Sequence, residues 1–236
     1  MGRKINIMTK TLVYKSFESK SSMYEPRGRG YRVARYALQA SKIALETRDQ
    51  LRVPRYNDGE RENNAEHSYM LALMAPELAD ALGLELNKSQ LAEFGVVHEL
   101  IEIITGDVPT FLITEDEQRQ KEQCEREVEA LLHLKLPPYM RSVHKEYESQ
   151  ATPEARFVRY VDKLLPIIVD ILGDGMRVMQ QDYGVSSIEA LRQAHEHLHA
   201  RIVTMFGNEF PALDLAHKIL CELFESQFEQ EITLNQ

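Results

Sequence analysis

The sequence predicts an all-α domain of about seven or eight helices. Three observations support this prediction. Apolar residues recur three and four positions apart in several long segments, no region is rich in strands, and strong helix-start signals stand at Thr114 and at Thr152-Pro153. With 236 residues, 43% of them apolar, the chain is long enough to bury a hydrophobic core.

The first 29 residues mix Lys, Ser, Thr and Tyr and end in the Gly/Arg-rich run EPRGRG, so we interpret residues 1–29 as a loose or strand-like arm. A first helix is expected from Tyr31 to about Gln50, and Pro54 stops it. The stretch that follows, LRVPRYNDGERENN, is rich in Arg, Asn, Asp and Gly and is predicted to be a loop.

A second helix is expected to start near Ala65 and to end at Gly83, with Pro76 kinking or splitting it. A third is expected to run from an Asn87 cap to about Thr105, where the loop TGDVPTF begins. Both segments are apolar apart from a few polar residues, and those residues carry the functional prediction developed below.

The second half of the chain is expected to continue in helices. A capping box at residues 114–117 starts a charged surface helix, and another helix follows Pro137-Pro138. The helix that starts at Thr152-Pro153 contains Pro166, which is expected to perturb its following turn. Two more helices, at roughly 187–206 and 211–228, complete the chain.

Composition excludes several classes of function. The formal net charge of −9 argues against a general nucleic-acid-binding surface. No apolar run approaches the length that spans a bilayer, and the first ten residues lack the apolar core of a signal peptide, so we expect no membrane partner. The two cysteines, Cys124 and Cys221, form no CxxC motif, which fits a cytoplasmic setting.

Polar residues interrupt otherwise apolar helices at three places. His67 lies in ENNAEHSYMLALM, His98 and Glu99 lie in AEFGVVHELIEII, and Asp162 lies in RFVRYVDKLLPII. Soluble cores exclude carboxylates unless they are paired or bind a metal. Two nitrogen and two oxygen ligands on three helices therefore predict one divalent cation, with open positions for water or substrate. The ligand types do not identify the metal.

Glu102 stands one turn after this His-Glu pair. His98 and Glu102 are four residues apart and share a helix face, whereas His98 and Glu99 point roughly 100° apart on an ideal helix. Both members of the pair contact one ion only if it lies between these directions. A bound metal lowers the pKa of a water ligand and polarises a phosphoryl oxygen, and Glu102 is then placed to orient that water or shuttle its proton.

Ordinary structural roles compete with this interpretation. A single histidine is usually a satisfied core or surface residue, and a single helical Asp or Glu is usually solvated. From spacing alone, Arg52 and Arg55 are interpreted as solvated surface charges. His195, His197 and His199 lie in a polar helix without an HExxH pattern and are interpreted as surface residues.

The runs ENNAEHS, VVHELIEIITGDVPT and HKEYESQATPEARFVRYVDKL together resemble the HD-domain metal-dependent phosphohydrolases. The nearest branch contains the bacterial 5′-deoxynucleotidase and its HD-domain-containing-2 relatives. The resemblance covers most of residues 31–175 and implies an all-α HD-domain bundle, often a homodimer, that uses one divalent ion such as Co, Mn or Mg. Fe, Ni and Zn stay open because the ligand types suit them as well. Residues 30–236, including the C-terminal helices, are expected to form this domain.

The resemblance also implies roles for individual residues. Its metal ligands match His67, His98, Glu99 and Asp162. Its catalytic glutamate matches Glu102, its aspartate at the sugar end of the substrate matches Asp107, and its phosphate-binding arginine matches Arg52. The implied reaction is release of phosphate from (deoxy)ribonucleoside 5′-monophosphates, so the expected partner is a small nucleotide.

Two positions depart from the family pattern. Glu99 replaces the hallmark aspartate, which places the carboxylate one methylene further out. Val53 replaces a tryptophan beside the phosphate-binding arginine, so the sequence leaves the choice between deoxyribose and ribose open. Two alternatives stay open as well: a hydrolase of nucleoside triphosphates or other phosphometabolites, and a non-catalytic nucleotide-binding dimer.

Overall fold

The computed structural model describes residues 28–234. The chain divides into two units, Met1–Lys42 and Ile43–Gln236. The arm predicted at residues 1–29 lies outside the described residues except for its last two. Residues 29–42 form the first part of helix α2 (Arg29–Arg48), and everything below concerns the second unit unless stated otherwise.

Eight helices of ten or more residues are present between residues 28 and 234, which confirms the predicted all-α class. They are α2 (Arg29–Arg48), α3 (Asn64–Ala81), α4 (Lys88–Val97), α6 (Glu115–Lys135), α7 (Pro138–Ser149), α8 (Pro153–Leu172), α10 (Ile188–Phe206) and α11 (Pro211–Leu234). The shorter elements are β1 (Leu51–Arg55), β2 (Arg61–Asn63), α5 (Glu102–Thr105), α9 (Gly175–Arg177) and a π-helical turn, η2 (Val178–Asp182). In this range no helix has the length and apolar character needed to cross a membrane.

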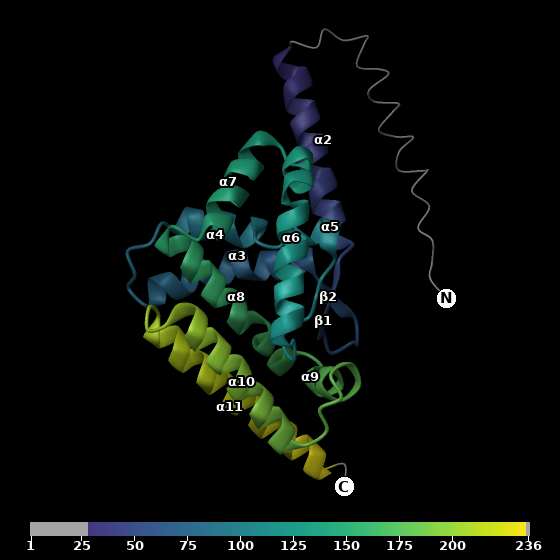
Figure 1. The fold of residues 1–236 in the computed structure, drawn as a ribbon, viewed down its shortest axis with the longest axis vertical. Coiled ribbons are helices and arrows are strands. Elements are labelled where there is room, and N and C mark those ends of the chain that lie inside the picture. Colours follow the sequence, from purple (N-terminus) through teal and green to yellow (C-terminus); the bar gives the residue numbers. More distant parts are fainter. Residues whose placement is uncertain (1–27, 235–236) are drawn as a thin grey trace, which may run out of the picture. The chain divides into compact units, whose positions relative to one another are not determined.

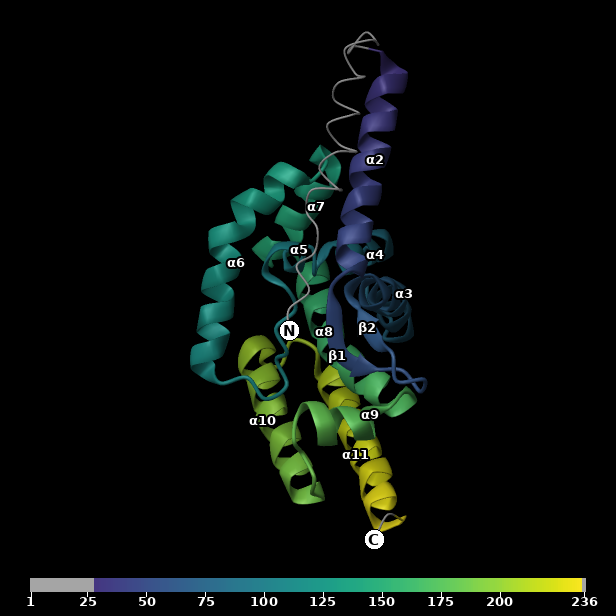
Figure 2. The ribbon, with the colours of Figure 1, turned by 90° about the vertical axis from the view of Figure 1, so that its right-hand side faces the viewer.

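Helix α8 lies in the middle of the second unit (Figures 1 and 2). In Figure 2, α6 and α3 lie on opposite sides of it, and the antiparallel pair α10 and α11 lies below. The buried side of α8 includes Phe157, Val158, Val161 and Leu165, which join the main hydrophobic core. Because neighbours pack around it on several sides, a polar residue on α8 is buried unless it opens on a cavity.

The stretch between α2 and α3, predicted to be a loop, is a two-stranded antiparallel hairpin of β1 and β2. The prediction was wrong because the run Asp58-Gly59 forms the kind of turn that joins paired strands. Gly59 has a φ of 83°, and the Asp58 side chain accepts a hydrogen bond from the Glu60 N–H at 3.0 Å. The hairpin holds Arg52, on β1, close to the start of α3.

The helix predicted from residue 87 to residue 105 is interrupted after α4. His98 Nδ1 donates to the Gly95 carbonyl at 2.9 Å, and this carbonyl is the acceptor that the Glu99 N–H would use in an unbroken α-helix. Tighter i→i−3 bonds follow, such as that from the Glu102 N–H to the Glu99 carbonyl at 3.0 Å. The His-Glu pair therefore lies in a turn, and its directions differ from those of an ideal helix.

Neither internal proline ends its helix. Helix α3 runs through Pro76 to Ala81, so the predicted split does not occur, and α8 runs through Pro166 to Leu172. A proline removes one N–H donor from the helix interior. Burial of the flanking Ala75 and Ala79 offsets that loss in α3, since tertiary packing supplies most helix stability in a folded protein.

Candidate active site

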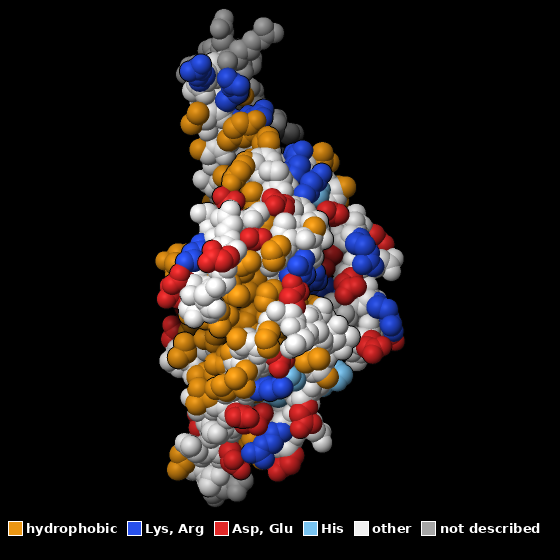
Figure 3. Space-filling view, turned by 90° about the vertical axis from the view of Figure 1, so that its left-hand side faces the viewer, with side chains coloured by type: hydrophobic (Ala, Val, Ile, Leu, Met, Phe, Trp, Pro, Cys, Tyr) orange, Lys and Arg blue, Asp and Glu red, His pale blue; other side chains and the backbone are white. Residues whose placement is uncertain are grey.

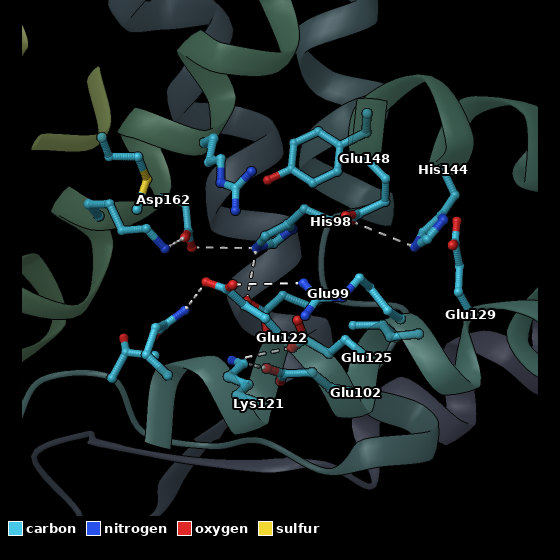
Figure 4. A pocket seen from close by; sticks show the side chains of 18 of the residues that line it. His98, Glu99, Glu102, Lys121, Glu122, Glu125, Glu129, His144, Glu148 and Asp162 are labelled. Carbon is cyan, nitrogen blue, oxygen red and sulfur yellow. Dashed lines mark hydrogen bonds and ion pairs between the residues drawn. The ribbon is translucent and has the colours of Figure 1, made fainter. Parts of the chain in front are cut away.

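Three parts of the second unit bring polar side chains to one point. Helix α3 supplies His67, the turn after α4 supplies His98 and Glu99, and α8 supplies Asp162. One donor atom of each lies within 4.8 Å of the other three. The structure thus brings together all four residues that the sequence singled out as metal ligands, and Figure 4 shows His98, Glu99 and Asp162 at one side of a cavity.

The spacing of these donor atoms suits one cation. Asp162 Oδ1 lies 2.9 Å from His67 Nε2 and 3.5 Å from His98 Nε2, and His98 Nε2 lies 3.6 Å from Glu99 Oε1. Ligands about 2.1 Å from one ion lie roughly 3 to 3.5 Å apart at octahedral or tetrahedral angles. The set of imidazoles and carboxylates fits a divalent transition metal, although it does not choose one.

The two histidines are held as metal-binding histidines usually are. His98 Nδ1 donates to a backbone carbonyl, and its Nε2 is buried without a hydrogen-bond partner among the described residues. His67 Nδ1 lies 3.3 Å from Oε1 of the fully buried Glu62. Such outer partners fix the tautomer and orient the ligating nitrogen. Although burial and Arg52 oppose it, Asp162 and Glu62 raise the pKa of His67.

A second group of carboxylates adjoins the first. Donor oxygens of Glu99, Glu102 and Asp107 lie within 4.8 Å of one another. Burial opposes ionisation of Glu99, but Arg52 and His98 outweigh it and hold the pKa of Glu99 below its usual range. Burial and the charge of Glu99 raise the pKa of Glu102 well above its usual range. One ionised and one protonatable carboxyl group therefore stand side by side.

Glu102 is fixed by two donors. Asn64 Nδ2 donates to its Oε2 at 2.8 Å, and Lys121 Nζ, from α6, donates to its Oε1 at 3.2 Å. Because both oxygens already accept a hydrogen bond, the carboxyl group cannot rotate without breaking one of them. The glutamate is therefore held in place beside Glu99, a member of the group formed by His67, His98, Glu99 and Asp162 (the metal-ligand group).

Arg52 and Arg55 are not the solvated surface charges that spacing suggested. Arg52 is 9% exposed, and its guanidinium contacts Glu62 at 3.1 Å, Glu99 at 2.7 Å and Asp107 at 3.6 Å. Although burial opposes it, the surrounding carboxylates raise the pKa of Arg52, so the guanidinium stays charged. Arg55 pairs with Asp182 through two hydrogen bonds of 2.9 and 3.1 Å.

Two cavities meet at this site. The larger has a volume of about 620 Å³, within the range of small-molecule pockets, and runs between α6 and the helices α7, α8 and α10. The smaller has a volume of about 100 Å³ and includes Arg52, Val53 and Asp107 in its lining. Glu99 and Asp162 border both cavities, so the metal-ligand group is accessible from either one.

Sequence reasoning missed several residues of the site. The missed residues position His67 and Glu102 by hydrogen bonds; they are Glu62, Asn64 and Lys121. No sequence pattern marks them as functional, because Glu62 follows a hairpin turn and Lys121 lies on a helix of mixed charge. The interpretation of His195 as a surface residue was wrong. His195 is 4% exposed and borders the smaller cavity, and its Nδ1 lies 2.7 Å from Oε1 of Glu225.

Comparison with known proteins adds the family. The sequence profile described as "HD domain" matches residues 45–203. The human "5′-deoxynucleotidase HDDC2" is 33% identical over 119 residues, which cover 48% of this chain and 57% of the relative. The bovine protein of the same name is 30% identical over 152 residues, 61% of this chain and 70% of the relative. The chain thus spans little more than half the length of the human relative.

Solved structures show the same fold. A predicted metal-dependent phosphohydrolase from Magnetospirillum magnetotacticum is 27% identical, covers 84% of this chain and 95% of its own, and superposes with a TM-score of 0.62. An HD-domain phosphohydrolase from Listeria innocua is 20% identical, covers 85% and 99%, and has a TM-score of 0.51. The profile match covers two thirds of the chain and shows that the chain belongs to the HD domain family, and the solved structures share its fold.

Proposed function

We propose that this chain is a metal-dependent phosphomonoesterase acting on nucleoside 5′-monophosphates, with residues 30–236 as its catalytic domain. The observation that carries the proposal is the convergence of two imidazoles and two carboxylates in which His98 Nε2 is buried without a hydrogen-bond partner among the described residues. A buried acceptor of this kind is costly unless a ligand satisfies it. The relatives named 5′-deoxynucleotidase supply the substrate class.

In this proposal, His67, His98, Glu99 and Asp162 hold one divalent cation, from the group Co, Mn, Mg, Fe, Ni and Zn. When bound there, the ion supplies Lewis-acid polarisation of a phosphoryl oxygen and a water of lowered pKa. Glu62 keeps His67 in the ligating tautomer through the 3.3 Å contact with Nδ1. Arg52 keeps Glu99 ionised and directed toward the ligand group.

Glu102 is the proposed general base. Burial and the charge of Glu99 raise its pKa, so its carboxylate is a stronger base than that of an exposed glutamate. Asn64 and Lys121 hold its two oxygens in place. Asp107 is the proposed contact at the sugar end of the substrate, and it lies 3.6 Å from Arg52 on the wall of the smaller cavity. Arg52, whose guanidinium contacts both Glu99 and Asp107, is proposed to hold these two carboxylates in position.

The test is release of inorganic phosphate from a panel of ribo- and deoxyribonucleoside 5′-monophosphates with each of the six ions. We expect turnover that His98→Ala and Glu102→Gln abolish while the circular dichroism spectrum is unchanged. Orthophosphate as the product separates this reaction from triphosphate release by a nucleoside triphosphatase. No turnover with any ion, in a folded protein, would contradict the proposal.

Glu99 allows a direct test against the alternative of a non-catalytic nucleotide-binding protein. Its Oε2 lies 2.7 Å from Arg52 and its Oε1 lies 3.6 Å from His98, so the longer side chain already reaches the ligand group. We therefore expect the natural protein to be active and Glu99→Asp to alter its metal preference. Activity that appears only in Glu99→Asp would identify the natural protein as a binder.

We also propose a cytoplasmic homodimer. Exposed apolar side chains recur along α11 at Leu215, Ile219 and Leu223, four residues apart and therefore on one side of the helix. Figure 3 shows hydrophobic side chains gathered on one face of the molecule. Light scattering after size-exclusion chromatography is expected to give a molar mass of twice the 27.2 kDa of one chain. Ile219→Glu is expected to reduce this mass to that of a single chain. A monomeric natural protein would rule out the dimer.

A further inference from the structure

The cations nearest the metal-ligand group are already engaged by carboxylates. Arg52 donates through Nε to Glu62 and through Nη1 to Glu99. Lys163 Nζ donates to Asp162 Oδ2 at 2.6 Å. A bound phosphate dianion would have to compete with these partners for each of these cations. In a chain with a net charge of −9, an anion site needs local positive charge that is not already compensated.

Arg159, by contrast, forms no direct ion pair among residues 28–234. It stands on α8 three residues before Asp162, so the two side chains leave the same side of the helix. It is half-buried and borders the 620 Å³ cavity together with His98, Glu99 and Asp162. Within residues 28–234 its guanidinium has no hydrogen bond and no carboxylate oxygen within 4.0 Å, in contrast to Arg52 and Lys163.

Arg159 interacts electrostatically with Glu148 but forms no direct ion pair with it, so its N–H groups have no protein acceptor among residues 28–234. Its five donors match the oxygens of a phosphate group, and such contacts are frequently bidentate. Because Arg159 and Asp162 leave the same side of α8 and border the same cavity, an anion bound by Arg159 would be close to the residues that would hold a cation. The position is thus suited to a phosphoryl group that the metal polarises.

We propose that Arg159 binds the phosphoryl group of the substrate on the large-cavity side of the metal-ligand group, and that Arg52 is a positioning residue for Glu99 and Asp107. This inference rests on the proposed phosphomonoesterase function for its substrate class. It makes Arg159 a substrate-binding residue that no comparison assigns, and it assigns the two arginines different tasks. Figure 4 shows the large cavity with His98, Glu99 and Asp162 among the labelled residues of its lining.

The test compares Arg159→Ala, Arg159→Gln and Arg159→Lys with the control Arg126→Ala. Arg126 borders the same cavity, but its side chain is 68% exposed and is paired with Glu122 at 3.8 Å. Inorganic phosphate is titrated into each metal-loaded protein by calorimetry, and KM and kcat are measured for a deoxyribonucleoside 5′-monophosphate. Metal content and circular dichroism are recorded for every variant.

Loss of a charge-assisted bidentate contact is expected to weaken phosphate binding and to raise KM by about 10- to 100-fold in Arg159→Ala and Arg159→Gln. Arg159→Lys keeps the charge without the fork and is expected to fall between them and the natural protein. Arg126→Ala is expected to match the natural protein, and metal content is expected to stay constant in all four variants.

The inference is overturned if Arg159→Ala and Arg159→Gln bind phosphate as tightly as Arg126→Ala, or if their loss of binding follows a loss of metal or of helical structure. Its failure is separable from that of the proposed function. Phosphate binding that depends on Arg159, in a protein without turnover, would refute the enzyme and support the anion site. Turnover that does not depend on Arg159 would support the enzyme and refute the anion site at Arg159.

Discussion

The Nε2 atom of His67 lies 2.9 Å from Oδ1 of Asp162, and its Nδ1 atom lies 3.3 Å from Oε1 of Glu62. One imidazole is therefore placed between two carboxylates, and all three groups are buried. A neutral ring has one N–H and can donate to only one of them. A proton or a metal cation on the Asp162 side resolves this conflict, and a cation there is shared with His98 and Glu99.

The outer carboxylate can be tested without changing a metal ligand. Glu62→Gln removes the charged acceptor of the His67 N–H and is expected to lower metal affinity by about 10- to 100-fold, as the loss of such partners usually does. Competition with a chelator of known affinity measures the change. Glu66→Gln is the control, because Glu66 is next to His67 on α3 and the amide keeps its capping contact with the Asn63 N–H. Equal affinity in Glu62→Gln and Glu66→Gln would refute the role given to Glu62.

Close packing of α3 on α4 sets the distance between the two imidazoles. A methyl group on Gly95 would lie 2.8 Å from backbone atoms of Ala72, so Gly95→Ala forces the helices apart. We expect a loss of about 1 to 3 kcal/mol in the free energy of unfolding, together with weaker metal binding. Urea unfolding and metal titration measure these two effects.

Gly30 provides the matched control for that substitution. It also lies in a helix, but nothing is found within 4 Å of the position its Cβ would take. Gly30→Ala is expected to leave metal affinity unchanged and stability equal or slightly higher, because alanine favours the helix. If Gly95→Ala behaves like Gly30→Ala, the contact between α3 and α4 does not limit the geometry of the site.

Acid is expected to destabilise the α10–α11 pair through His217, which is fully buried. Burial, followed by the charge of His199, lowers the pKa of His217 from 6.5 to about 4. The unfolded chain binds this proton at a higher pH than the folded chain does, so unfolding takes up a proton between these values. Stability from the neutral ring is present above pH 6.5 and is lost as the pH falls toward 4.

This contribution is about 2 to 3 kcal/mol between pH 7 and pH 4.5. Urea unfolding at the two pH values, in the natural protein and in His217→Gln, isolates it as a difference of differences. The variant is expected to lose less stability than the natural protein on acidification. His144, whose pKa is lowered to about 4 by burial and by His133, contributes in the same direction to both proteins and cancels. An identical loss in both would contradict the assignment to His217.

Helix existence could be predicted from the sequence because its signals are local. The Thr114 cap with Glu117, and the Thr152 cap with Pro153 after it, stand where α6 and α8 begin. The hairpin before α3 was missed although Asp58-Gly59 is also a local signal, since its strands are short and charged. The break after α4 could not be predicted, because it depends on which carbonyl the His98 ring selects in the folded chain.

The candidate site also contains residues that the sequence reveals and residues that only the tertiary structure reveals. His67 and Asp162 stand out as polar residues in apolar runs, and the structure brings them within hydrogen-bonding distance. Lys121 and Arg159 are ordinary charged residues on amphipathic helices, and only the packing of α6 and α8 around one cavity gives them a role. Their contribution is a property of the tertiary structure, so spacing along the chain does not reveal it.

The most direct test of the central claim is anomalous X-ray scattering from crystals soaked with Co²⁺ or Mn²⁺ at the absorption edge of the metal. We predict one peak about 2.0 to 2.2 Å from His67 Nε2, from His98 Nε2 and from an oxygen of Asp162, with Glu99 as the fourth protein ligand. A folded protein whose soaked crystals show no peak at this point, or whose ion is bound by other residues, would contradict the account.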